Sequence, residues 1–192
     1  MKNLGVLVGF LPLIVFGILS GTTLESIQIA LLAALIVAVL VGHRTLRRGF
    51  FLEWANILMF AGALFCITIL HITAIADYMS IIIYLVLASV AFGSLIAKTP
   101  FTSQYARDMV DKSVWDHPAF IAINVFMTGV WGGLFVVNLL LGIISKIAAG
   151  PVGQIAGMLV YVVLIIGILF TMLYPDYVRK KHPRNAVPKT TP

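Results

Sequence analysis

Charged side chains are scarce in this chain of 192 residues: 10% of the residues are Asp, Glu, Lys or Arg, whereas 61% are apolar. Soluble domains carry roughly 25% charged residues. So few ionic groups do not cover a water-facing surface, which argues against a soluble enzyme, a nucleic-acid-binding protein and a disordered chain. The net charge of +6 therefore indicates contacts with anionic lipid headgroups rather than with nucleic acid.

The chain also lacks the residue patterns that catalysis or metal binding needs. Its single cysteine, Cys66, rules out an intramolecular disulfide and a thiolate cluster. The sequence contains no HExxH, GxSxG, P-loop or dinucleotide-binding motif, and no pair of carboxylates within an apolar run. We therefore expect no catalytic, metal-binding or cofactor-binding residues, and a protein that is not an enzyme.

Six apolar runs are the main feature of the sequence. Because a membrane-spanning helix needs about 20 mostly apolar residues, we predict an all-α fold: a polytopic bundle of about six transmembrane helices. The predicted spans cover roughly residues 4–19, 26–42, 54–75, 79–97, 120–144 and 151–174. The first run contains Pro12 and also fits a signal peptide cleaved near Ser20 and Gly21.

The basic residues predict the orientation. If the six runs alternate in direction, every Lys and Arg except Lys146 falls on the side of the N-terminus. The positive-inside rule then places both the N- and C-termini in the cytoplasm. Residues 176–192 combine prolines with basic residues, which predicts a basic, disordered cytoplasmic tail.

The segment between the fourth and fifth runs shows a helical pattern. Thr99 is a suitable N-cap before a proline, and apolar residues then recur every four positions. This predicts a short helix over about 100–113. The helix either lies at the membrane interface or serves as a connector packed under the bundle. The candidate residues for contact with a partner protein or with lipid are Pro100, Phe101, Tyr105, Arg107 and Trp115.

Polar residues within the runs are few. Four of them share one face of the fifth run: Asn124, Thr128, Trp131 and Asn138. They either hydrogen bond to neighbouring helices or line the polar path of a small transporter or channel. His71, the one histidine predicted inside the bilayer, either hydrogen bonds to a neighbouring helix or belongs to the same polar path. For Glu53, beside Trp54, we favour a hydrated boundary residue over a functional one.

Small residues spaced by four occur in several runs, for example Gly129 with Gly133 and Gly153 with Gly157. In lipid, such steps allow helix backbones to approach closely. They predict a tightly packed bundle. They are equally compatible with a homo-oligomer.

Several short motifs follow one another along the chain in a characteristic order. They are Phe10-Leu11-Pro12-Leu13, an alanine-rich second run, Lys98-Thr99-Pro100, Val114-Trp115 followed by Asn124 and Trp131, and an aromatic and basic stretch over residues 174–181. This order resembles the intracellular septation protein A (YciB) family of bacterial inner-membrane proteins. Thr99 departs from the family pattern, which favours a second basic residue there, and the tail is longer.

The resemblance implies a multi-pass protein of the bacterial inner membrane that takes part in maintaining the cell envelope. Membrane integrity, septation and cell elongation are the implied processes. They would depend on contacts with lipids and with cell-division or elongation membrane proteins. The resemblance carries over no catalytic residues.

Overall fold

The computed structural model describes residues 5–181, and these residues form helices, turns and loops without a strand. The predicted all-α fold is therefore confirmed for this part of the chain. The elements are α1 (Gly5–Gly9), α2 (Leu11–Leu19), α3 (Leu24–Arg47), α4 (Phe51–Thr68), α5 (Ala74–Asp77), α6 (Met79–Ile96), α7 (Phe101–Ala106), the 3-10 turns η1 (Arg107–Met109) and η2 (Lys112–Val114), α8 (Pro118–Ile147) and α9 (Pro151–Lys181).

Five helices are long and apolar enough to cross a membrane: α3, α4, α6, α8 and α9. Their outward-facing residues include many large apolar side chains, which suits a surface in contact with lipid tails. By helix length and hydropathy, the chain is therefore a multi-pass membrane protein.

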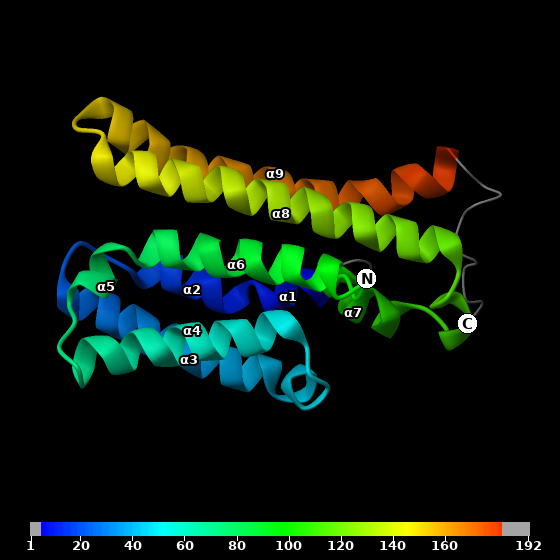
Figure 1. Cartoon of the computed structure of the whole chain (residues 1–192), viewed down its shortest axis with the longest axis horizontal. Helices are drawn as coiled ribbons and strands as arrows, with labels where there is room; N and C mark the ends of the chain where they lie inside the picture. Colours follow the sequence, from blue (N-terminus) through cyan, green and yellow to red (C-terminus); the bar gives the residue numbers. More distant parts are fainter. Residues whose placement is uncertain (1–4, 182–192) are drawn as a thin grey trace.

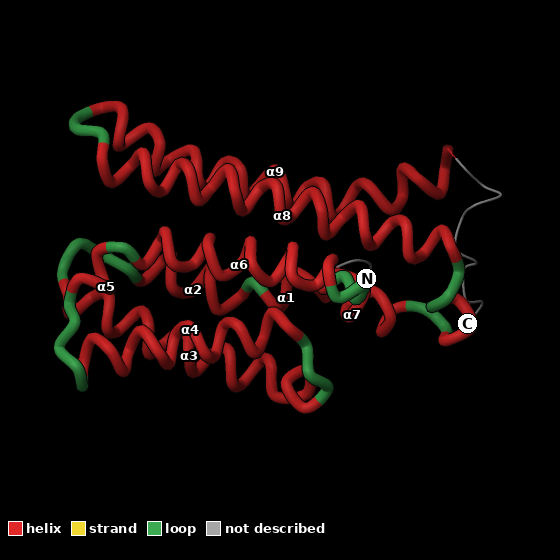
Figure 2. Tube along the Cα trace, in the orientation of Figure 1, coloured by secondary structure: helices red, strands yellow, loops and turns green. Residues whose placement is uncertain are grey.

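The sixth predicted span, over residues 4–19, is not among these five helices, and residue 4 lies outside the described residues. The helix is broken at Phe10, so α1 has 5 residues and α2 has 9. Pro12, at the start of α2, has no N–H and its ring clashes with the carbonyl one turn earlier. Figure 2 shows the short step between the two pieces. At 1.5 Å per residue, α2 is only about 14 Å long.

The long helices run side by side and alternate in direction, as Figure 1 shows. α8 packs against both α6 and α9, and α3 packs against both α2 and α4. The broken α1–α2 segment connects these two groups of helices. Phe10, at the break, stacks on Trp131 of α8 at 4.7 Å between ring centroids, and Phe16 of α2 lies 5.8 Å from Phe60 of α4.

Three predicted boundaries differ from the structure. The third span ends at Thr68 rather than at residue 75, and a turn and α5 follow it. The helix predicted over 100–113 is divided into α7 and two 3-10 turns. Residues 176–181 belong to α9 rather than to a disordered tail, and the rest of that predicted tail, 182–192, lies outside the described residues.

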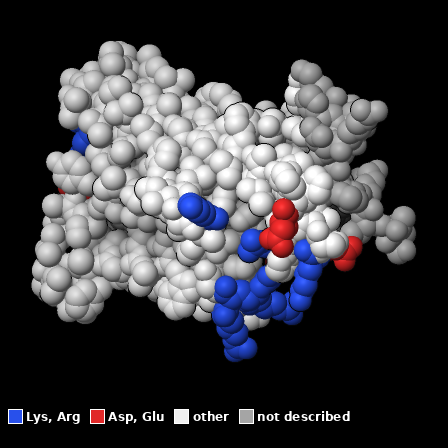
Figure 3. Space-filling model, turned by 45° about the vertical axis from the view of Figure 1, so that its right-hand side comes forward, with Lys and Arg blue, Asp and Glu red and all other residues white. Residues whose placement is uncertain are grey.

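Charged residues gather at the two ends of the bundle. We call the end that carries α7 the basic end, and Figure 3 shows the Lys and Arg side chains clustered there. The basic side chains that the structure describes at this end are those of Arg44, Arg47, Arg48, Lys98, Arg107 and Lys112. The opposite end carries Glu25, Asp77 and Lys146, and Lys146 pairs with Asp77 at 3.4 Å.

Candidate functional site around a buried carboxylate

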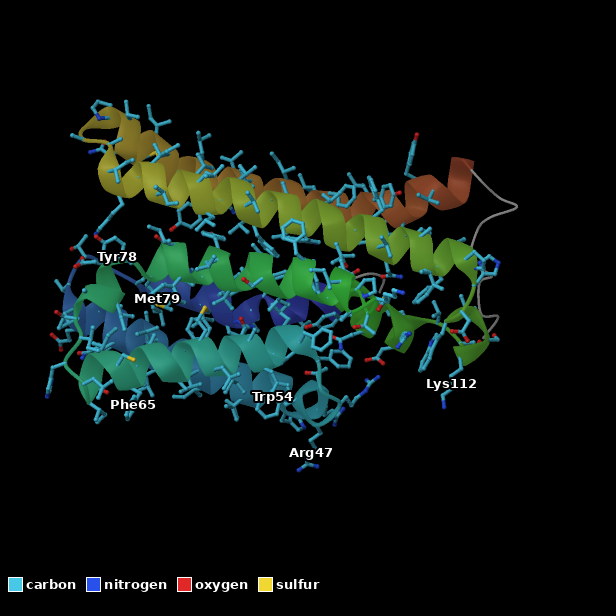
Figure 4. All side chains as sticks on the ribbon, viewed as in Figure 1. Arg47, Trp54, Phe65, Tyr78, Met79 and Lys112 are labelled. Atoms are coloured by element: carbon cyan, nitrogen blue, oxygen red, sulfur yellow. The ribbon has the colours of Figure 1, made fainter. Side chains whose placement is uncertain are left out.

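Glu53, in the first turn of α4, is buried in the structure. Its exposed fraction is 6%, whereas the neighbouring Trp54 is 47% exposed and points away from the bundle in Figure 4. The interpretation of Glu53 as a hydrated boundary residue is therefore wrong. The reason is tertiary: α7 folds over the beginning of α4, and the Tyr105 hydroxyl donates a hydrogen bond to Glu53 Oε2 at 2.6 Å.

The local structure holds Tyr105 in this position. The side chain of Gln104 accepts a hydrogen bond from the backbone N–H of Phe51 at 3.0 Å, and so caps the start of α4. The ring of Phe50 meets the ring of Tyr105 edge to face at 5.0 Å. Burial, together with the adjacent Glu53 carboxylate, raises the pKa of Tyr105 above its ordinary value. The hydroxyl therefore keeps its proton and remains a donor.

Asn56 lies one turn further along α4, on the same face as Glu53, and is 1% exposed. Its Nδ2 donates a hydrogen bond to the carbonyl of Gly9 at 2.9 Å, directly beside the break between α1 and α2. Its Oδ1 is buried and makes no hydrogen bond with any residue that the structure describes. Asn56 thus supports the broken helix and also presents an unpaired acceptor.

Two glycines allow these groups to come together. A Cβ atom at Gly9 would lie 2.6 Å from Tyr105 Oη, and one at Gly42 of α3 would lie 3.1 Å from Glu53 Cγ. A side chain at Gly9 would therefore displace Tyr105. A side chain at Gly42 would press on Glu53.

A small cleft lies between these elements. It encloses about 200 Å³, opening included, and its interior has space for about one water molecule. We call it the Glu53 cleft. It is lined by Val8, Gly9, Pro12, Ala38, Val41, Gly42, Glu53 and Asn56.

The polar face predicted on the fifth span is present on α8 and is buried. Thr128 Oγ1 lies 2.8 Å from Thr102 Oγ1 of α7, and Thr102 Oγ1 also donates to the backbone carbonyl of Asn124 at 3.0 Å. Trp131 Nε1 donates to Thr171 Oγ1 of α9 at 3.0 Å. The side chains of Thr128 and Trp131 thus join α8 to its neighbours, whereas the side chain of Asn124 donates from Nδ2 to the Phe120 carbonyl of α8 itself at 2.8 Å.

Asn138, the fourth residue of this face, differs from the others. It is fully buried in α8, and neither its Nδ2 nor its Oδ1 makes a hydrogen bond with a described residue. Asn138 does not line the Glu53 cleft.

His71 is not part of the helix that forms the third span, to which the prediction assigned it. His71 lies in the exposed turn after α4, with a φ of 56°. The apolar run continues past Thr68, but the chain leaves the helix there, and His71 lies outside α4. The structure does not bring His71 to the polar face of α8.

The five candidate contact residues divide into two groups. Pro100, Phe101 and Tyr105 are buried, because α7 packs against α1, α6 and α8. They do not form an exposed contact surface, and α7 is the packed connector that the sequence left open as an alternative. Arg107 and Trp115 remain partly exposed, and the guanidinium of Arg107 lies 5.1 Å from the Trp115 ring centroid.

The sequence patterns did not predict the Glu53 cleft. A signal for part of it was present, since Glu53 and Asn56 are three residues apart and so share a helix face, and Pro12 predicts a disturbed helix. The pairing with Tyr105 had no signal, because 52 residues separate the two side chains along the chain.

No protein-family model matches this chain, and neither a curated protein nor a solved structure matches it.

Proposed function

We propose that this chain is a non-enzymatic, multi-pass protein of the bacterial inner membrane that helps to maintain the cell envelope. Its basic end contacts anionic lipid headgroups and neighbouring membrane proteins, including those of cell division and elongation. The observation that carries the proposal is the gathering of exposed basic side chains at that end.

Five of these basic residues are exposed; Arg48 pairs with Asp108, and the other four lie at two of the connections between long helices. Arg44 and Arg47 end α3, Lys98 follows α6, and Lys112 begins η2. Near an anionic membrane surface, each Lys or Arg contributes about 1 kcal/mol of attraction. The hydrogen bonds between α7, α4 and α8 hold this end together, so the basic groups act as one surface.

The proposed role in maintaining the cell envelope rests on the sequence motifs that resemble those of the intracellular septation protein A family. A polar path along α8 has less support, because Asn124, Thr128 and Trp131 take part in hydrogen bonds within the protein. Transport along that face therefore remains the weaker alternative.

The proposal is tested in a strain of the source organism that lacks the gene. We expect longer cells and lower survival of a hypo-osmotic shift, and rescue of both by the intact gene. The variant Arg44→Gln/Arg47→Gln/Lys98→Gln/Lys112→Gln should insert in the membrane but rescue poorly.

The matched control conserves every charge: Arg44→Lys/Arg47→Lys/Lys98→Arg/Lys112→Arg should rescue like the wild type. Full rescue by the uncharged variant would contradict the role of the basic end. Normal length and survival of the deletion strain would contradict the envelope function itself.

A further inference from the structure

The carboxyl group of Glu53 lies in the protein interior, and no described cationic side chain pairs with it. Among the acidic side chains that the structure describes, it is the one that is buried. No described Lys, Arg or His lies within ion-pair distance of its carboxylate. A buried carboxylate is costly unless a positive charge or several donors compensate it, and Glu53 receives one hydrogen bond, from the neutral Tyr105 hydroxyl.

A second oxygen in the same cleft is also uncompensated. Asn56 Oδ1 is buried and has no hydrogen-bond donor among the described residues, while Asn56 Nδ2 is held by the Gly9 carbonyl. Because Nδ2 faces the Gly9 carbonyl at the helix break, Oδ1 is the end of the amide that faces away from the break. Glu53 and Asn56, which carry these two uncompensated acceptor groups, both line one small cleft.

The helix break beside the cleft leaves a backbone carbonyl without its usual helical donor. Because Pro12 has no N–H, the usual helical hydrogen bond to the carbonyl of Val8 does not form. Val8, Gly9 and Pro12 all line the cleft. Interrupted helices in membrane proteins commonly expose carbonyl oxygens to ions in this manner.

We propose that the Glu53 cleft binds one monovalent cation of about the size of sodium. The surrounding oxygens are the ligands that hard cations prefer. One carboxylate balances one positive charge, and the described residues contain no group of three His, Cys, Asp or Glu that would suit a divalent or transition metal. The cleft has space for about one water molecule, which suits a single dehydrated ion.

The cleft is partly open at its edge beside α1 and α3. Two of its lining residues, Val8 and Val41, are 47% and 37% exposed.

Arg48, a basic residue close in sequence to Glu53, is bound to Asp108 at 2.6 Å, and this hydrogen bond raises the pKa of Arg48. The charge of Arg48 is therefore compensated outside the cleft.

The test measures the thermal unfolding of the purified full chain in detergent, at constant pH and ionic strength. NaCl is compared with choline chloride, because choline is too large for the cleft. A ligand that binds the folded state raises Tm with its concentration, so we expect a higher Tm in NaCl. Glu53→Gln should lose this dependence, and the control Glu25→Gln, at an exposed glutamate of the opposite end, should keep it.

A direct measurement covers the case in which Glu53→Gln does not fold. Wild-type protein should retain radioactive sodium in a filter-binding assay, and unlabelled sodium should displace it, whereas choline should not. Equal Tm in sodium and choline together with no retained sodium would overturn the proposal. A Tm that depends on pH but not on sodium would assign the cleft to a proton and would also overturn it.

Discussion

At the scale of single residues, the hydrogen bond between Tyr105 and Glu53 decides how α7 meets α4. It joins two buried groups, with exposed fractions of 5% and 6%. When such a bond loses one partner, the other is left buried and unsatisfied, which costs more than the bond itself contributed. The space that Gly9 leaves for the Tyr105 hydroxyl belongs to the same arrangement.

We expect Tyr105→Phe to lower the free energy of unfolding by about 1–3 kcal/mol, because Glu53 then loses its one described hydrogen-bond donor. Chemical or thermal unfolding in detergent measures the change. Tyr78→Phe is the matched control, since Tyr78 is 49% exposed at the opposite end. If both variants lose the same stability, the bond to Glu53 has no special importance.

At the scale of elements, α7 is a short helix held by its neighbours rather than by its own length. It has 6 residues, and isolated helices of this length are not stable in water. Its backbone N–H at Phe101 is capped by Ser94 of α6 at 3.1 Å, and Thr102 bonds to α8. The polar face of α8 therefore has a physical function as the docking surface for α7.

Replacing Thr128 by Val keeps the shape of the side chain and removes its hydrogen bond to Thr102. The expected cost is about 1 kcal/mol. This should increase amide hydrogen exchange in α7 roughly fivefold, as measured by mass spectrometry on residues 101–106. Thr68→Val is the control, because Thr68 is exposed and bonds within its own helix. Unchanged exchange in α7 would show that the packing of apolar groups alone holds it.

At the scale of the whole molecule, the separation of charges between the two ends sets the orientation in the membrane. The basic end has several described Lys and Arg residues, whereas the opposite end has one, Lys146. From the positive-inside rule we predict that the basic end faces the cytoplasm. The pairing of Lys146 with Asp77 leaves little unpaired positive charge at the other end.

Cysteine labelling tests this orientation. In a Cys66→Ala background, Ser113→Cys introduces a thiol at the basic end and Ala149→Cys introduces one in the loop between α8 and α9. Both positions are exposed. In intact cells, a membrane-impermeant maleimide should label the Ala149→Cys protein alone, and permeabilised cells should allow both to react. The reverse pattern would mean the opposite orientation.

Much of the fold follows from local properties of the sequence. The scarcity of charge and the apolar runs determined that the chain is an all-α membrane protein, because lipid cannot satisfy unpaired backbone groups and each spanning helix satisfies its own. The five long helices coincide with predicted runs. Pro12 marked the first run as irregular, although the run length still predicted a full span.

The tertiary structure alone decided which polar groups are buried together. The burial of Glu53, the exposure of His71 and the partners of the α8 residues depend on how distant segments pack, and the spacing of residues along one helix does not contain that information. Apolar character and helical period are properties of neighbours in sequence. A hydrogen bond such as that between Tyr105 and Glu53 forms only after α1, α3, α4 and α7 have assembled around one cleft.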